Sequence, residues 1–182
     1  LLALEWNNGN RTVLVDQRLT GLLLGQTLHT KPHEIYRSLV EATAFGALTI
    51  INRLEEYGIK VKEVINCGGI SEKNDMVLQI YADVTGREMK VSSSSQTCDI
   101  GACISGAVVA GAYENFGQAQ QAMCSTKDVS FKPDTENRKI YKQLYKLYMQ
   151  LHDSFGVKGH GGSLFNVMKE LLAIKDRVNS QG

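Results

Sequence analysis

The sequence predicts an α/β fold, and three observations support this prediction. An apolar run from Val64 ends at Gly68-Gly69 and is followed by an amphipathic stretch to Asp83, which predicts a strand, a tight loop and a helix. Upstream, apolar residues recur at helical spacing between residues 32 and 57. The hydrophobic content of 43% and the charged content of 21% over 182 residues are typical of a globular chain with a buried core.

The N-terminal segment predicts loops and short elements. Trp6 to Arg11 is a polar turn cluster, and Leu22 to Leu28 is a short apolar run interrupted by Gly25. The chain begins with the apolar residues Leu1 to Leu4 and without an initiator Met. We therefore expect it to be truncated at its N-terminal side, as a piece of a longer protein.

The clearest element is a long helix that begins at Pro32. Proline is favoured at the first position of a helix, because the N–H that it lacks has no partner there. The helix is expected to end near Tyr57-Gly58. The apolar residues of its expected core face are Ile35, Leu39, Ala42, Phe45, Leu48, Ile51 and Leu54.

A strand–helix–strand unit follows. Lys60 to Cys67 and Glu88 to Val91 have the composition of strands. Between them, Glu72 to Thr85 predicts a helix that is closed by Gly86. Such alternation is typical of an α/β layer.

The next predicted helix, from Asp99 to Tyr113, follows a hydroxyl-rich loop from Ser92 to Thr97. Small residues let a helix lie close to another backbone, so we expect this helix to be buried against the sheet or a neighbouring helix. The small residues are Gly101, Ala102, Ser105, Gly106, Ala107, Ala110, Gly111 and Ala112.

A further helix follows Asp134 and carries an aromatic stripe of Tyr141, Tyr145 and Tyr148. An aromatic stripe at helical spacing predicts contacts in a core or an interface rather than a cofactor site.

The C-terminal segment suggests a division of the chain. Residues 156–163 are rich in glycine and predict a linker, and Leu164 to Val178 predicts a terminal amphipathic helix. We therefore expect a domain over residues 1–155, a linker over 156–163 and a terminal helix within 164–182.

Charge and cysteine content argue against several classes of protein. A net charge of +1 provides no field suited to nucleic acid or anionic lipid, so we expect no nucleic-acid partner. No apolar segment approaches the roughly 20 residues that span a bilayer, so we expect no membrane partner. The cysteines form no CxxC pair, which predicts free thiols in or near the core of a cytoplasmic protein. They are Cys67, Cys98, Cys103 and Cys124.

The histidines predict no metal site. His29 and His33 have helical spacing, but Pro32 stands between them and discourages a continuous helix there.

The glycine pair Gly68-Gly69 is the candidate ligand site. Glycines at the end of a strand let the backbone approach a flat or anionic ligand without a Cβ in the way. The start of the following helix offers free N–H groups and the positive end of its dipole. This combination is suited to a nucleotide.

Several motifs together resemble a known family. A glycine pair after a strand, polar residues on the next helix and a glycine–alanine pair on the small-residue helix resemble the adenosine-binding region of the FGGY carbohydrate kinases. The stretch from Gly21 to Glu41 is similar to the second signature of that family, although Gln26 and Leu39 depart from its usual residues. The residues that carry the first resemblance are Gly68, Gly69, Asn74, Gln79, Asp83, Gly101 and Ala102.

The resemblance implies an actin-like, ribonuclease-H-like ATPase domain, the second domain of a sugar kinase, with a C-terminal helical extension. Such kinases transfer the γ-phosphoryl group of MgATP to a sugar hydroxyl. The implied ligands are ATP or ADP, Mg²⁺ whose site lies mostly outside this chain, and a ketopentose held through an upstream N-terminal domain. Because the catalytic base and the sugar-binding residues of the family also lie upstream, we assign no catalytic and no metal-binding residue here.

The same resemblance assigns roles to four residues. Backbone at Gly68 and Gly69 is expected beside the ribose and the α-phosphate, with Ser71 nearby. The Asn74 amide is expected at the adenine edge. The alternative is that the glycine pair is only a turn and Asn74 only a residue of the first helical turn.

Gln79 and Asp83 are weaker candidates for a ligand contact. Their helical spacing predicts that they stabilise their helix or its surroundings.

Other functions stay open at this level. The chain could belong to a sister kinase of the family that acts on another sugar, or it could be a non-catalytic nucleotide-binding or assembly module. We also expect an exposed sheet edge that drives association into a homo-oligomer.

Overall fold

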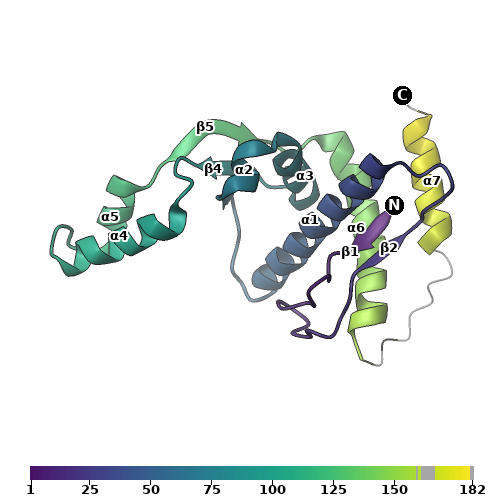
Figure 1. Ribbon diagram of the computed structural model, residues 1–182, viewed down its shortest axis with the longest axis horizontal. Helices are drawn as coiled ribbons and strands as arrows, with labels where there is room; N and C mark the ends of the chain where they lie inside the picture. Colours follow the sequence, from purple (N-terminus) through teal and green to yellow (C-terminus); the bar gives the residue numbers. More distant parts are fainter. Residues whose placement is uncertain (159, 161–166, 181–182) are drawn as a thin grey trace.

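The computed structural model describes residues 1–158, 160 and 167–180, and it has two small sheets and seven helices within them (Figure 1). The α/β prediction is confirmed. The elements in chain order are β1 (Leu2–Leu4), β2 (Leu22–Leu24), α1 (Pro32–Glu56), β3 (Val64–Asn66), α2 (Gly69–Lys73), α3 (Asp75–Thr85), β4 (Met89–Ser92), α4 (Thr97–Val109), α5 (Phe116–Met123), β5 (Thr126–Phe131), α6 (Thr135–Gly156) and α7 (Val167–Asn179).

The first sheet is formed by β1 and β2. The two strands pair antiparallel, with Leu2 opposite Leu24 and Leu4 opposite Leu22. All three residues of β1 are buried, and β1 packs against α1 and α6. The short elements expected before residue 32 are therefore confirmed, and one of them belongs to the core.

Helix α1 has the predicted bounds. Pro32 occupies its first turn, and the Glu34 carboxylate accepts a hydrogen bond from the Lys31 N–H at 2.7 Å, which caps the helix. Gly58, with φ +86°, follows its C-terminal end. The inward face of α1 includes the buried Phe45 and Thr49.

The second sheet has the order β3-β4-β5. Strands β3 and β4 are parallel, whereas β4 and β5 are antiparallel. The strand expected from residue 60 to 67 is shorter than predicted, because its charged N-terminal part from Lys60 to Glu63 lies mostly exposed and outside the ladder. Within the described residues β3 pairs only with β4, so the expected exposed sheet edge is present there.

The helix predicted from Glu72 to Thr85 is two helices, and this part of the prediction is wrong. The backbone leaves the helical region at Asn74, with φ −144° and ψ 87°, so that α2 ends and α3 begins at this residue. Asparagine is a favoured N-cap, since its carbonyl oxygen can accept from the free N–H groups of a helix start. The predicted C-terminal end is confirmed: Gly86 has φ +68° and closes α3.

The main core lies between β1, α1, α3 and α6. The tyrosine stripe of α6 packs into it, with Tyr141 and Tyr148 buried and Tyr145 half-buried. The Phe45 ring lies 5.4 Å from that of Tyr148 and 6.2 Å from that of Tyr141, measured between centroids. The prediction that this stripe belongs to a core is confirmed.

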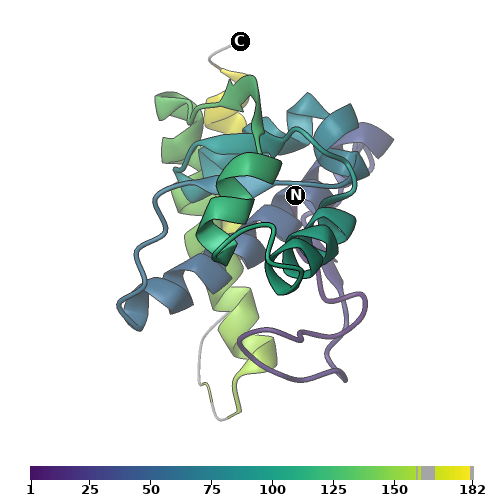
Figure 2. The same cartoon turned by 90° about the vertical axis from the view of Figure 1, so that its left-hand side faces the viewer.

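Helix α4 is not buried, which corrects the expectation for the small-residue helix. With α5 it forms a pair that extends away from the body, at one end in Figure 1 and in front of the body in Figure 2. Only Ile104 is buried among the residues of α4. Helix α4 packs mainly on α5, and a Cβ at Gly101 or Gly106 would meet no neighbouring atom within contact distance.

The cysteines are free, as predicted, but the expectation that they lie in or near the core is wrong. All four are exposed. Cys98 and Cys103 lie on α4 and share its exposure, whereas Cys67 and Cys124 lie in the connections after β3 and α5. Small neighbours in the sequence therefore did not indicate burial for these thiols.

The predicted linker over residues 156–163 begins at the last residue of α6. Gly156, expected in the linker, is the last residue of α6, and a Cβ there would collide with Leu14 and press on Trp6. Of the predicted linker and terminal helix, residues 159, 161–166, 181 and 182 lie outside the described residues. Helix α7 packs against α6, and Ile174 joins the core. None of the described helices is long and apolar enough to span a membrane.

Candidate functional site

The four predicted site residues lie on one short segment after β3. Gly68 has φ +86° and ψ 172°, a backbone conformation that is essentially restricted to glycine. Gly69 has no such requirement, and a Cβ on it would meet open space. The structure therefore gives the two glycines different roles: Gly68 shapes the turn, and Gly69 leaves room next to it.

Ser71 is buried and faces the loop. Its hydroxyl donates a hydrogen bond to the Gly68 carbonyl oxygen at 2.7 Å. This hydrogen bond stabilises the turn at Gly68 and occupies the Ser71 hydroxyl. Ser71 therefore shapes the site without lining the groove.

Asn74 joins three elements. Its Oδ1 accepts a hydrogen bond from the Val77 N–H at 3.3 Å, which caps α3. Its Nδ2 donates to the hydroxyl of Tyr36, on α1, at 3.4 Å. Asn74 is thus a helix cap, rather than a residue of a first helical turn, and its side chain links the start of α3 to α1.

A groove of about 800 Å³ is lined by residues of α1, α2 and α3. This volume is within the roughly 300–1,000 Å³ range of small-molecule sites, and its walls are mostly apolar, as in such sites. Gly69 and Asn74 line the groove, but Gly68 and Ser71 do not. The lining residues are Tyr36, Leu39, Val40, Thr43, Gly69, Ile70, Lys73, Asn74, Val77 and Tyr81.

The wall contributed by α1 was not predicted as part of the site. Leu39 was expected in the core, yet it is 39% exposed and lines the groove. Tyr36 is 51% exposed, and Ile70, on the facing wall, is 70% exposed. Three large apolar side chains that remain exposed around one groove indicate a surface suited to a ligand with an apolar face.

Gln79 and Asp83 have the structural role that was expected. Gln79 Nε2 donates to Asp83 Oδ1 at 2.8 Å, which confirms the contact along the helix. Asp83 is buried and also accepts from the Asp134 N–H at 2.7 Å and from Asn137 Nδ2 at 3.1 Å. It therefore anchors the start of α6 on α3 and has no part in the groove.

Charged groups are few around the groove. Lys73 is the one ionisable side chain of its lining besides the two tyrosines. Within residues 1–158, 160 and 167–180, no group of three or more His, Cys, Asp or Glu side chains is arranged to hold a metal ion. This part of the chain thus offers an apolar slot with a few hydrogen-bonding groups, but no metal-binding cluster.

Comparison with known proteins places the chain in a family. Residues 1–110 match the C-terminal domain of the FGGY family of carbohydrate kinases. The chain is 52% identical over 184 residues to a ribulokinase from Geobacillus thermodenitrificans and 53% identical over 184 residues to one from Anoxybacillus flavithermus. Each match covers 99% of this chain and 32% of the relative, so the chain spans about one third of their length.

The solved structures give the same result for the fold. Gluconate kinase from Lactobacillus acidophilus superimposes with a TM-score of 0.76 at 20% sequence identity, covering 87% of this chain and 32% of that chain. At this identity the likeness shows the fold alone, which is the actin-like ATPase fold that the sequence motifs implied. With the domain match over residues 1–110, these findings confirm the resemblance drawn from the motifs: the chain belongs to the FGGY family of carbohydrate kinases.

Proposed function

We propose that this chain is the nucleotide-binding portion of an ATP-dependent carbohydrate kinase, and that the kinase phosphorylates L-ribulose. The observation that carries the nucleotide assignment is the apolar groove between α1 and α2–α3, which opens beside Gly69 and presents the Asn74 amide. The sugar assignment follows from the ribulokinase relatives, which match over 99% of this chain.

The groove supports binding of the base. Burial of apolar surface is the main source of affinity for a flat heterocycle, and a few polar groups orient it. The exposed side chains of Leu39 and Ile70 lie on opposite walls and supply the apolar surface. Asn74 supplies N–H groups for a ring nitrogen of the base.

The glycine turn supports approach of the ribose and the α-phosphate. Because a Cβ at Gly69 would point into open space, the backbone there can be approached by a ligand atom. Ser71 holds the turn through its bond to the Gly68 carbonyl. We therefore keep all four predicted residues in the site, with Gly69 and Asn74 near the ligand and Gly68 and Ser71 shaping the turn.

The chemistry of transfer is proposed to lie elsewhere in the protein. Phosphoryl transfer requires Mg²⁺ on the polyphosphate, stabilisation of the transferring group and a base at the sugar hydroxyl. The described residues contain no metal-binding cluster, and the groove lining contains no carboxylate. We assign the binding and orientation of the nucleoside to this chain. We assign the binding of Mg²⁺, the catalytic base and the binding of the sugar to upstream residues.

We likewise keep the division into a domain over residues 1–155 and a terminal helical extension as a proposal.

Titration of the chain with MgADP tests the nucleotide site. Asn74→Ala is expected to weaken binding, and Asn115→Ala is its matched control. Asn115 is also an N-cap, since its side chain accepts from the Gln118 N–H at 3.0 Å, but it caps α5, far along the chain from the groove. Equal effects of the two variants on MgADP affinity would show that only helix capping had been lost.

A second test uses the exposed Cys67, which immediately precedes Gly68. Bound MgADP is expected to slow alkylation of Cys67, measured for each cysteine by mass spectrometry, while Cys124, which is also exposed, keeps its rate. Alkylation of Cys67 at an unchanged rate under saturating nucleotide would contradict the assignment of this loop.

The division of labour has its own test. With ATP, Mg²⁺ and L-ribulose, the chain alone is expected to release no ADP above a blank in a coupled assay. Turnover by the chain alone would mean that residues of this chain perform the transfer, and the placement of the catalytic groups upstream would be wrong.

A further inference from the structure

We propose that Tyr36 and Asn74 form a pair that reads the hydrogen-bonding edge of a purine, and that the pair accepts both adenine and guanine nucleotides. The inference rests on the proposed function, because it assigns base selectivity to the same groove. Its foundation is the hydrogen bond between the Tyr36 hydroxyl and Asn74 Nδ2, at 3.4 Å across the groove.

The orientation of the Asn74 amide is determined by the helix that it caps. A backbone N–H can only donate, so the atom of Asn74 that faces the Val77 N–H is the carbonyl oxygen Oδ1. The amide nitrogen Nδ2 is therefore the atom that faces Tyr36. Asn74 thus presents N–H donors to the groove, and a flip of its amide would break the cap of α3.

Tyr36 has the opposite property, because its hydroxyl is adaptable. A phenol oxygen can accept hydrogen bonds while its own hydrogen donates, and that hydrogen can rotate. Within the described part of the chain the Tyr36 hydroxyl has a single partner, the Asn74 amide, and the side chain is 51% exposed. It keeps one hydrogen and one lone pair for a ligand.

The rest of the groove offers little competing polar chemistry. Tyr81 donates its hydroxyl hydrogen to Thr43 at 2.9 Å, so these two lining residues already bond to each other. Lys73 adds a flexible, strongly hydrated charge that gives no directional readout. Direction at the base edge therefore comes from the Tyr36–Asn74 pair.

The donor and acceptor pattern of the pair fits two purines. Each purine has an acceptor ring nitrogen, N7, next to the group at C6, which is an amino donor in adenine and a carbonyl acceptor in guanine. Asn74 donates to the ring nitrogen in both cases. Tyr36 accepts from the amino group of adenine or donates to the carbonyl of guanine. A pyrimidine covers less of the apolar wall and is expected to bind more weakly.

The test is the affinity of the chain for MgADP, MgGDP and MgCDP, measured by titration with ligand-detected NMR so that weak binding is also quantified. ADP and GDP are expected to bind within about threefold of each other. Tyr36→Phe is expected to weaken both by about fivefold, the effect of one neutral hydrogen bond. Tyr57→Phe is the control, since Tyr57 is 79% exposed and lies outside the groove.

The double variant Tyr36→Phe/Asn74→Ala separates a pair from two independent contacts. If the two side chains act together, its loss of ADP affinity will be smaller than the sum of the two single losses. Strict additivity of the losses overturns the pairing. Unchanged melting temperature in Tyr36→Phe checks that the exposed ring has been altered without loss of the fold.

The outcomes distinguish this inference from the proposed function. If Asn74→Ala weakens ADP binding but Tyr36→Phe does not, or if GDP binds more than about 30-fold more weakly than ADP, about 2 kcal/mol by the standard conversion, the inference is wrong and the nucleotide site stands. If ligand-detected NMR shows no binding of ADP to the folded wild-type chain, both this inference and the proposed function are wrong.

Discussion

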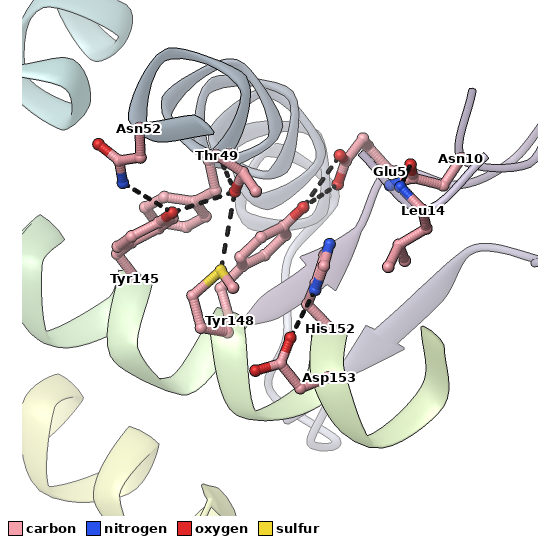
Figure 3. A network of polar contacts seen from close by, with 11 residues as sticks. Glu5, Asn10, Leu14, Thr49, Asn52, Tyr145, Tyr148, His152 and Asp153 are labelled. Atoms are coloured by element: carbon pink, nitrogen blue, oxygen red, sulfur yellow. Dashed lines mark hydrogen bonds and ion pairs between the residues drawn. The ribbon is translucent and has the colours of Figure 1, made fainter. Parts of the chain in front are cut away.

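The Tyr148 hydroxyl donates to both carboxylate oxygens of Glu5, at 3.0 and 2.9 Å (Figure 3). Tyr148 lies on α6 and is fully buried, and Glu5 directly follows β1, so this contact connects the N-terminal strand to α6. Gly46, on α1, leaves the space into which the Glu5 carboxylate projects, since a Cβ there would collide with it. Burial raises the pKa of Glu5, and burial together with the Glu5 charge raises the pKa of Tyr148.

Tyr148→Phe is expected to lower the free energy of unfolding by about 1–3 kcal/mol, because it leaves a buried carboxylate without its side-chain donor. Urea denaturation followed by circular dichroism measures this. Tyr57→Phe, at an exposed ring, is expected to change stability by less than about 0.5 kcal/mol. Equal stability of Tyr148→Phe and wild type would mean that the hydroxyl contributes nothing to the fold.

Glu5→Gln is expected to remove a pH dependence of stability. The folded-state pKa of Glu5 is raised above its ordinary value of 4.5, so its favourable contribution is full below that value and is lost as the pH rises through the raised pKa. The free energy of unfolding of wild type minus that of Glu5→Gln should therefore fall as the pH rises above 4.5. His152 and Tyr148 face Glu5 in the wild type, so the difference reports the carboxyl group together with its coupling to these two side chains. A difference that rises with pH would contradict the sign.

Asp83→Asn is expected to cost about 2–3 kcal/mol of folding stability, since three donors converge on the Asp83 carboxylate and an amide would place its own N–H groups against them. Thermal and urea unfolding measure the loss. Asp128→Asn, at an exposed position on β5, is the matched control and is expected to leave stability nearly unchanged. A similar small effect at both positions would refute the anchoring role of Asp83.

The two glycines of the candidate site are expected to respond oppositely to alanine. Gly68→Ala forces a Cβ onto a φ of +86° and should destabilise the protein by about 1–3 kcal/mol. Gly69→Ala meets open space and should be neutral, or stabilising by up to about 1 kcal/mol. MgADP affinity should fall in Gly69→Ala despite its intact fold. Retained affinity there would mean that no ligand atom approaches Gly69.

All four cysteines are expected to react with a thiol reagent in the native protein, because all four are exposed. The absorbance change without denaturant should equal that in guanidinium. A native reaction of fewer thiols would show that α4 or the loops are covered in solution.

The sequence predicted the regular elements well where local chemistry decides them. Pro32 and the apolar period that follows it predicted α1, and Gly86 predicted the end of α3. These predictions succeeded because caps and periodicity are local properties. The break at Asn74 is also a local feature, yet it was missed. An asparagine in a helical pattern can be either an N-cap or an ordinary helical residue, and the surrounding sequence looks similar in the two cases.

Only part of the groove lining was expected from the sequence. Gly68-Gly69 and Asn74 form a contiguous motif that the sequence displays. Tyr36 and Leu39 were missed as groove residues, because helical periodicity cannot tell a core face from a face that lines a groove. The exposure of α4 was missed for a similar reason: small residues indicate that close approach is sterically allowed, but not that a neighbour is present.

By itself the sequence determined the α/β class, the family motifs and the glycine turn, since these depend on residues that are near one another along the chain or on motifs that can be compared directly. Only the tertiary structure decided which faces meet. It placed Tyr36 across from Asn74, 38 residues away, and Glu5 beside Tyr148, 143 residues away. Such contacts depend on how helices pack, and packing follows from the combined shape of many side chains rather than from any local pattern.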